Sequence, residues 1–164
     1  TVAQLLITAD NLTHEIRHAN FTNTLTRLLE LGVVPVINEN DTVATEEIVI
    51  GDNDTLAAEV ARSVGAQLLI LLSDIDGLYT ADPHTDPNAK LLPVVNRIDE
   101  DIKKLAGVSS TAQGTGGMVT KLRAAEICLD CGCEMVIANG NNPAVLYDIV
   151  EGLPVGTRFV GEKT

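Results

Sequence analysis

The chain has 164 residues, a formal net charge of −12 and 45% apolar residues, but only 2% aromatic residues and no Trp. These values predict one globular domain with an aliphatic core, and a surface this acidic argues against nucleic acids and anionic membranes as main partners. We expect a cytoplasmic protein, because no apolar run reaches the roughly 18–20 residues of a membrane-spanning helix, no signal peptide is visible and the three Cys cannot form a disulfide framework.

Short apolar runs alternate along the chain with patterns of helical periodicity. In the first half they predict strands over residues 2–8 and 33–38, a helix around residues 21–29 that Gly32 ends, an exposed arm over residues 45–50 and a helix over residues 54–64. In the second half they predict strands over residues 67–72, 134–138 and 157–160, and helices over residues 99–106, 118–131 and 144–150.

The alternation of apolar strands and helices is typical of a parallel sheet covered by helices on both faces. We therefore predict an α/β fold, a three-layer α/β/α sandwich with a mostly parallel central sheet, formed as one domain by residues 1–164. Ligands of such sheets bind outside the carboxyl ends of the strands. We expect the polar residues that follow the strands at 33–38 and 67–72 to lie at that edge.

The segment GTGGMVTK, residues 114–121, has the composition of an anion site at the start of a helix. Glycines ahead of a helix let backbone N–H groups approach an anion closely, and the helix dipole favours negative charge there. Lys121 falls in the first turn, where its ammonium group can reach the same anion. The local pattern leaves two interpretations open, a phosphate-binding segment and a flexible loop that leads into a helix.

Three further polar clusters follow predicted strands or precede helices. The run NEND, residues 38–41, ends in Asp41, which could pair with an ammonium group. The run GDND, residues 51–54, could bind a ligand or could equally supply the N-cap of the next helix. Residues 73–83 (SDIDGLYTADP) leave the most apolar strand, and they do not form a calcium loop, since the twelfth position from Asp74 is Thr85 and not Glu.

Two patterns could hold a metal, and neither is complete. His14 and His18 match the H-E-x-x-H helix of zinc proteases, but no third ligand suggests itself and the surrounding residues are polar. Cys128, Cys131 and Cys133 lack a fourth ligand at zinc spacing, and they are more typical of small buried residues near a helix end. We expect no metal site formed by protein side chains.

Four segments, in this order, carry a resemblance to a known family: VPVINENDTVAT, GDNDTLAA, LLSDIDGLYTADP and GTGGMVTKLRAA. From Thr1 to about Phe159, the chain resembles the glutamate 5-kinases of the amino acid kinase family. The loop DIDGLYTADP is shared more widely, with aspartokinases and uridylate kinases. The runs NEND, GDND and GTGGMxTK single out the glutamate 5-kinases.

The resemblance implies a role for each matching position. Asp41 and Asn53 correspond to residues that hold the glutamate substrate, and Asp54 corresponds to the aspartate that organises the catalytic lysines. Ser73 and Asp74 correspond to a nucleotide-binding pair that is more often Thr-Asp. A second nucleotide-binding segment, whose lysine stabilises the phosphoryl group in transfer, corresponds to Thr115, Gly116, Gly117, Met118, Val119, Thr120 and Lys121.

The resemblance also implies a reaction. ATP, with Mg²⁺, would phosphorylate L-glutamate to γ-glutamyl phosphate, the first step of proline biosynthesis. Proline inhibits many members of the family, and the resemblance implies a homo-oligomer. Two alternatives stay open: a sister kinase that acts on another carboxylate or on a nucleotide, and a fragment that binds nucleotide or glutamate without turnover.

One difference from the family concerns the start of the chain. Family members begin with a strand and a glycine-rich turn that carries another phosphate-facing lysine, whereas this chain has no Gly before Gly32 and no Lys before Lys90. A serine of the glutamate site belongs to the same front part. We therefore expect residues 1–164 to be an amino acid kinase domain that lacks its N-terminal part, without the RNA-binding-like C-terminal domain of some members.

Overall fold

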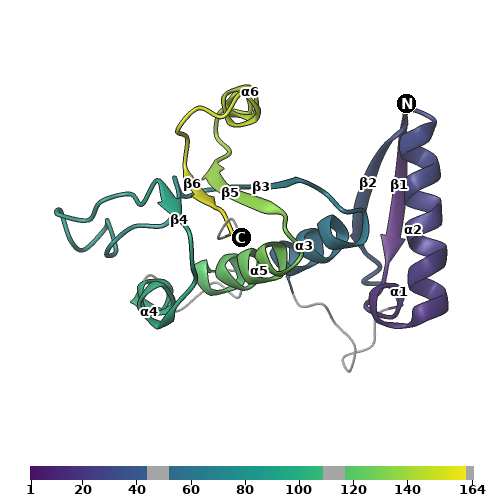
Figure 1. The fold of residues 1–164 in the computed structure, drawn as a ribbon, viewed down its shortest axis with the longest axis horizontal. Helices are drawn as coiled ribbons and strands as arrows, with labels where there is room; N and C mark the ends of the chain where they lie inside the picture. Colours follow the sequence, from purple (N-terminus) through teal and green to yellow (C-terminus); the bar gives the residue numbers. More distant parts are fainter. Residues whose placement is uncertain (44–51, 109–116, 162–164) are drawn as a thin grey trace.

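The computed structural model describes residues 1–43, 52–108 and 117–161 (Figure 1). From the N-terminus come β1 (Val2–Ile7), α1 (Asp10–Thr13), α2 (Glu15–Glu30), β2 (Val34–Glu39) and α3 (Asn53–Ser63). The remaining elements are β3 (Leu68–Ser73), β4 (Val94–Val95), α4 (Glu100–Val108), α5 (Met118–Asp130), β5 (Glu134–Asn139), α6 (Val145–Val150) and β6 (Thr157–Phe159). None of the helices in these ranges is long and apolar enough to cross a membrane.

The strands and helices predicted for the described residues are confirmed, with shifts at their ends. The helix expected around residues 21–29 begins earlier, at Glu15, and Gly32 follows its end with a φ of 67°, a value that residues with a side chain rarely adopt. No pattern predicts the short α1 and β4, because four and two residues are too few to show a period. The arm predicted over residues 45–50 lies outside the described residues.

A four-stranded sheet of order β3-β5-β6-β4 forms the centre of the molecule (Figure 1). The pairs β3–β5 and β4–β6 are parallel, and β5–β6 is antiparallel. Helices cover both faces: Met135 and Ile137 of β5 lie in the core shared with α3 and α5, whereas Val136 and Ala138 pack against Ile149 of α6. The predicted three-layer α/β/α arrangement with mostly parallel strands is therefore confirmed for this sheet.

The strands β1 and β2 form a second sheet, which is two-stranded and parallel. The structure differs here from the prediction of a single central sheet, because no described strand joins β2 to β3 by hydrogen bonds. Helix α3 links the two sheets instead. Its Leu56 packs with Phe21 and Leu25 of α2, while Ala58 and Ala61 lie in the core of the four-stranded sheet. One helix therefore supports both sheets.

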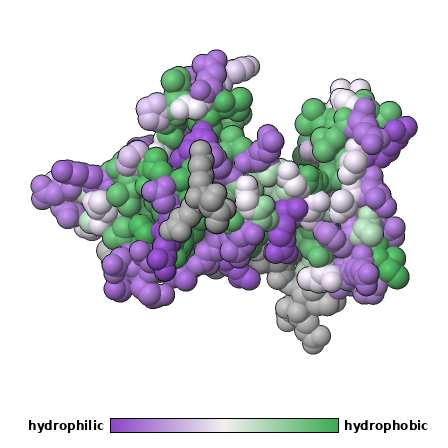
Figure 2. Space-filling view, viewed as in Figure 1, coloured by the Kyte–Doolittle hydropathy of each residue, from purple (hydrophilic) through white to green (hydrophobic). Residues whose placement is uncertain are grey.

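One face of the two-stranded sheet is open to solvent in the described part of the chain. Val2 and Leu6 of β1 and Val34 and Val36 of β2 are between 50% and 69% exposed, and the register places Val2 beside Val34. Figure 2 shows apolar residues over the upper parts of β1 and β2 and around α6, on either side of a hollow. Because parallel sheets are normally covered on both faces, this uncovered apolar face is a surface on which further protein can pack.

A single buried hydroxyl fixes the loop that follows β3. Thr157 of β6 is fully buried, and its Oγ1 accepts a hydrogen bond from Leu78 N at 2.8 Å and donates one to Leu92 O at 2.7 Å. A Cβ added to Gly77 would come within 2.5 Å of this oxygen, so a side chain at position 77 does not fit without movement. The loop between β3 and β4 is therefore anchored to the sheet near both of its ends.

We expect the uncovered apolar face to drive self-association of this chain. Replacing both Val34 and Val36 by Thr keeps β-branched side chains but makes the face less apolar, and it should lower the mass measured by light scattering after size-exclusion chromatography. The matched control replaces Ile16 and Leu31 by Thr, two exposed apolar residues outside this face, and should leave the mass unchanged. Equal effects of the two double variants would contradict the prediction.

Thr157→Val should lower the free energy of unfolding by about 1–3 kcal/mol, because it leaves the buried Leu78 N–H without an acceptor. Urea unfolding followed by circular dichroism measures the change. Thr24→Val removes an exposed hydroxyl bonded to the helix carbonyl of Asn20, and this control should stay within about 0.5 kcal/mol of the wild type. A loss for Thr157→Val as small as that of the control would show that the hydroxyl does not anchor the loop.

Candidate active site

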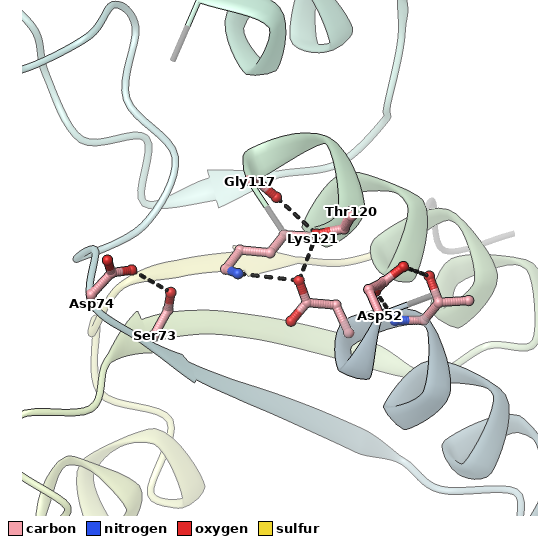
Figure 3. A network of polar contacts seen from close by, with 8 residues as sticks. Asp52, Ser73, Asp74, Gly117, Thr120 and Lys121 are labelled. Carbon is pink, nitrogen blue, oxygen red and sulfur yellow. Dashed lines mark hydrogen bonds and ion pairs between the residues drawn. The ribbon is translucent and has the colours of Figure 1, made fainter. Parts of the chain in front are cut away.

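Polar side chains gather where β3 ends and where α3 and α5 begin (Figure 3). Ser73, the last residue of β3, lies beside Asn139, the last residue of β5, in parallel register. Helices α3 and α5 share one core, and their first turns carry Asp54 and Lys121. The candidate site therefore lies at the carboxyl edge of the sheet, where the architecture predicts it.

The two aspartates at the start of α3 make different contacts. Asp52 is the N-cap residue: its Oδ1 accepts a hydrogen bond from Thr55 N at 2.7 Å, and its Oδ2 accepts one from Thr55 Oγ1 at 2.9 Å. The capping interpretation of the run GDND is thus correct for Asp52. Asp54, two residues later, is turned toward α5 instead.

Asp54 forms a largely buried ion pair with Lys121. Lys121 Nζ lies 3.1 Å from Asp54 Oδ2, and the two side chains are only 10% and 18% exposed. Thr120 Oγ1 donates a hydrogen bond to the same oxygen at 2.7 Å. A buried ammonium group requires such a partner, because an uncompensated charge at this depth would be strongly destabilising. The structure therefore brings together the two residues expected to be catalytic.

The N-terminus of α5 is not capped by any side chain of the described residues. Its N-cap residue is Gly117, and its first turn holds no acidic residue. The first N–H groups of an α-helix have no partner within the helix, and they carry partial positive charge. With Lys121 in the first turn, this end of α5 fits an anionic group such as a phosphate.

The other residues predicted to bind nucleotide differ in what they can offer. Met118 is buried in the core and Val119 is exposed, so only their backbone N–H groups suit an anion. The Thr120 hydroxyl is directed at Asp54. Thr115 and Gly116 lie outside the described residues.

Ser73 and Asp74 form a local pair at the end of β3. Ser73 Oγ donates a hydrogen bond to Asp74 Oδ1 at 3.0 Å, and Asp74 is exposed. Figure 3 shows the side chain of Lys121 extended toward the side on which this pair lies. We therefore expect the pair and the start of α5 to border the same part of the site.

Sequence reasoning misses a second polar network next to this pair. Asn139 Nδ2 donates to Asp76 Oδ1 at 2.9 Å, and Tyr79 OH donates to Asp76 Oδ2 at 3.0 Å. Burial, together with the hydrogen bond to Asp76, raises the pKa of Tyr79 above its ordinary value. Asn139 also borders a hollow of about 520 Å³ that extends along the start of α6. The available signal is the polar run NGNN, which begins where the strand predicted at 134–138 ends.

The two residues expected to hold glutamate are both exposed. Asp41 lies in the turn after β2, and Asn53 is the first residue of α3, directly before Asp54. Residues 44–51, which lie between them in the chain, are outside the described residues. The structure leaves both side chains available to a ligand and places Asn53 next to the Asp54–Lys121 pair.

The two metal patterns do not form metal sites in the described ranges. His14 is the N-cap of α2 with an extended backbone, so the two histidines do not share one continuous helix, and His18 Nε2 lies 2.9 Å from Ser63 Oγ. Burial raises the pKa of Cys128 to about 12, so this side chain remains a thiol and not the thiolate that binds zinc. Within the described ranges, no three His, Cys, Asp or Glu side chains could hold a metal ion together.

Comparisons with known proteins place the chain in a family. The model of the amino acid kinase family matches residues 1–139. The chain is 56% identical over 151 residues to glutamate 5-kinase of Rhodospirillum rubrum, covering 92% of this chain and 40% of the relative. It is 53% identical over 162 residues to glutamate 5-kinase of Deinococcus radiodurans, covering 99% of this chain and 45% of the relative. The chain thus spans less than half the length of these two relatives.

A solved structure has the same fold. The isopentenyl phosphate kinase of T. acidophilum matches with a TM-score of 0.64 at 21% identity, over 96% of this chain and 59% of that protein. At this identity the likeness concerns the fold alone. The family model, by contrast, covers most of the chain and includes Asp54, Ser73, Asp74 and Lys121. The chain belongs to the amino acid kinase family.

Proposed function

We propose that this chain is part of a glutamate 5-kinase, which transfers the γ-phosphoryl group of ATP to the side-chain carboxylate of L-glutamate. One observation carries the proposal: Lys121, held by Asp54, lies in the first turn of a helix whose N-terminus no described side chain caps. The identity of more than 50% to two glutamate 5-kinases supports the choice of substrate. The activity is proposed for the whole protein, and residues 1–164 supply part of its kinase domain.

The residue types of the site fit this chemistry. A glutamate carboxylate is ionised at pH 7, so its oxygen can attack the γ-phosphorus without a general base. A bond forms from that oxygen to phosphorus, the bond from phosphorus to the bridging oxygen breaks, and ADP leaves with the electron pair. What the protein must supply is positive charge, because one anion approaches another.

The start of α5 supplies this positive charge. The Lys121 ammonium group and the first backbone N–H groups of the helix, at Met118 and Val119, can meet the phosphates together. Mg²⁺ prefers phosphate oxygens and water to a cage of protein side chains, so we expect it to arrive with ATP and to neutralise part of the triphosphate charge. Asp54 keeps the ammonium group in one place.

The remaining predicted residues bind the two substrates. Asp41 pairs with the ammonium group of glutamate, and Asn53 holds glutamate through its amide group, next to Asp54. Ser73 and Asp74 bind the nucleotide at the end of β3. The segment from Thr115 to Lys121 binds the phosphates, with Thr115 and Gly116 assigned by resemblance alone.

We also propose a pathway, a cellular compartment, an inhibitor and an assembly for this enzyme. The reaction is the first step of proline biosynthesis and takes place in the cytoplasm, where ATP is available. Proline is the expected inhibitor, and copies of the protein are expected to assemble into a homo-oligomer.

An assay of ADP release tests this function. The whole protein receives ATP, Mg²⁺ and one acceptor at a time: L-glutamate, L-aspartate, N-acetyl-L-glutamate, UMP or none. We expect turnover with L-glutamate alone. Turnover with another acceptor would identify a sister kinase, and nucleotide binding without turnover would identify a binding protein. The 164-residue chain on its own should fall well below the roughly 1–100 s⁻¹ of kinases, because it spans less than half the length of the two glutamate 5-kinases that it matches.

Lys121→Ala should lower kcat by about 10²–10³ with little change in the KM for ATP, because its charge acts mainly in the transition state. Lys104→Ala removes an exposed ammonium group of α4 and should leave kcat unchanged. The thermal unfolding midpoint is measured for both variants, since the first leaves the Asp54 carboxylate without this partner. A higher KM for ATP with an unchanged kcat would show that Lys121 only binds the nucleotide.

Asp41→Ala should weaken glutamate binding by about 1.5–3 kcal/mol and leave ATP binding unchanged, because a contact between ammonium and carboxylate is lost. Titration calorimetry with each ligand measures both affinities. Asp101→Ala, which removes an exposed carboxylate of α4, is the control for the change in net charge. Equal loss of both affinities in the Asp41 variant would indicate a folding defect, and an unchanged glutamate affinity would remove Asp41 from the site.

A further inference from the structure

Thr120 directly precedes Lys121, and its hydroxyl is turned toward α3 (Figure 3). Thr120 Oγ1 lies 2.7 Å from Asp54 Oδ2, the oxygen that also contacts Lys121 Nζ at 3.1 Å. Neighbouring residues of α5 therefore place two donors on one carboxylate oxygen of α3. A role for Thr120 as a nucleotide contact does not account for this arrangement.

The single proton of the Thr120 hydroxyl has two acceptors within reach. Gly117 O lies 2.8 Å from Thr120 Oγ1, but this carbonyl already accepts the backbone N–H of Thr120 at 3.2 Å. A carboxylate forms shorter and stronger hydrogen bonds than a carbonyl does. The hydroxyl therefore donates to Asp54, and Gly117 O keeps its backbone donor.

We propose that Thr120 is a positioning residue for phosphoryl transfer, which fixes the Asp54 carboxylate and through it the Lys121 ammonium group. This inference rests on the proposed function and gives Thr120 a role other than nucleotide contact. The carboxylate cannot rotate about its Cβ–Cγ bond without breaking the short hydrogen bond to Thr120. The ammonium group is thereby presented from one fixed point, as electrostatic catalysis requires of its charges.

A nucleotide contact and a positioning residue affect different kinetic constants, the KM for ATP and kcat. A residue that holds ATP directly contributes to the KM for ATP, whereas a residue that positions Lys121 contributes to the rate of transfer. Loss of the Thr120 hydroxyl should therefore lower kcat. It should also free the ammonium group from its fixed position and make the amine easier to reach.

Three variants of the whole protein test this role: Thr120→Val, Thr120→Ala and Thr120→Ser. Val keeps the branched shape of Thr but lacks the hydroxyl. Ala lacks both the branch and the hydroxyl, and Ser keeps the hydroxyl but lacks the methyl group. We expect kcat to fall about 10–100-fold in the Val and Ala variants, with the KM for ATP within about twofold of the wild type. The Ser variant should keep most of the activity, and Thr24→Val on α2 is the matched control.

A second measurement needs no turnover. The rate at which an N-hydroxysuccinimide ester acylates Lys121 in the free protein is followed by peptide mass spectrometry. Acylation should be faster in the Val and Ala variants and close to the wild-type rate in the Ser variant. This readout is independent of the acceptor that is phosphorylated, so it still tests the proposal if glutamate proves not to be the substrate.

Three results would overturn the proposal. A higher KM for ATP without a lower kcat in the Val and Ala variants would make Thr120 a nucleotide contact. Acylation of Lys121 that is unchanged or slower in these variants would show that the hydroxyl does not hold the ammonium group. A Ser variant that fails as the Val variant does would show that packing matters and the hydroxyl does not. If the Val variant does not fold, the comparison of Ala with Ser gives the answer.

Discussion

The ion pair between Asp54 and Lys121 joins the first turns of two helices that are far apart in the sequence. Since both side chains are largely buried, neither charge can be left alone, and the starts of α3 and α5 must stay together. Helix α3 also supports the two-stranded sheet through Leu56 and the four-stranded sheet through Ala58 and Ala61. The pair therefore ties the start of α5 to the helix that packs against both sheets.

The two helix starts complement each other. Helix α3 satisfies its own N-terminus with Asp52 and presents a negative charge, Asp54, to its neighbour. Helix α5 keeps a glycine at its N-cap and presents a positive charge, Lys121. The acidic residue neutralises the lysine in the protein, while no described side chain caps the N-terminus of α5. This arrangement is how a strongly acidic chain would hold the polyanionic ligand proposed above at one small region.

Much of the fold follows from the sequence, because periodicity and glycine positions are local signals. The helix of residues 118–131 is predicted to begin at Met118 and to end before Gly132, and α5 does so within one residue. The site is predicted in part for the same reason, since polar runs follow the strands. Local signals also left the run GDND ambiguous between cap and ligand. The structure resolves it for the two aspartates, because Asp52 accepts hydrogen bonds from Thr55 whereas Asp54 contacts Lys121.

Features that depend on partners distant in sequence could not be predicted in this way. Strand order is not contained in a local period, so neither the division into two sheets nor the contact of Asn139 with Asp76 was visible. The apolar runs of β1 and β2 resemble strands buried on both faces, although one face is exposed here. The direction of the Thr120 hydroxyl depends on the neighbouring helix, and only the assembled core reveals it.

The N-terminus of α5, which no described side chain caps, has a thermodynamic consequence for the proposed function. Asp52 caps α3 permanently, whereas an anion bound at α5, as proposed above, would cap that helix only while the ligand is present. A ligand that binds only the folded chain shifts the folding equilibrium in proportion to the logarithm of its concentration. If the proposed anion binds there, the first turn of α5 is more stable in the loaded protein than in the free one. Occupancy of the proposed site and local folding of this helix are then two linked equilibria, each of which favours the other.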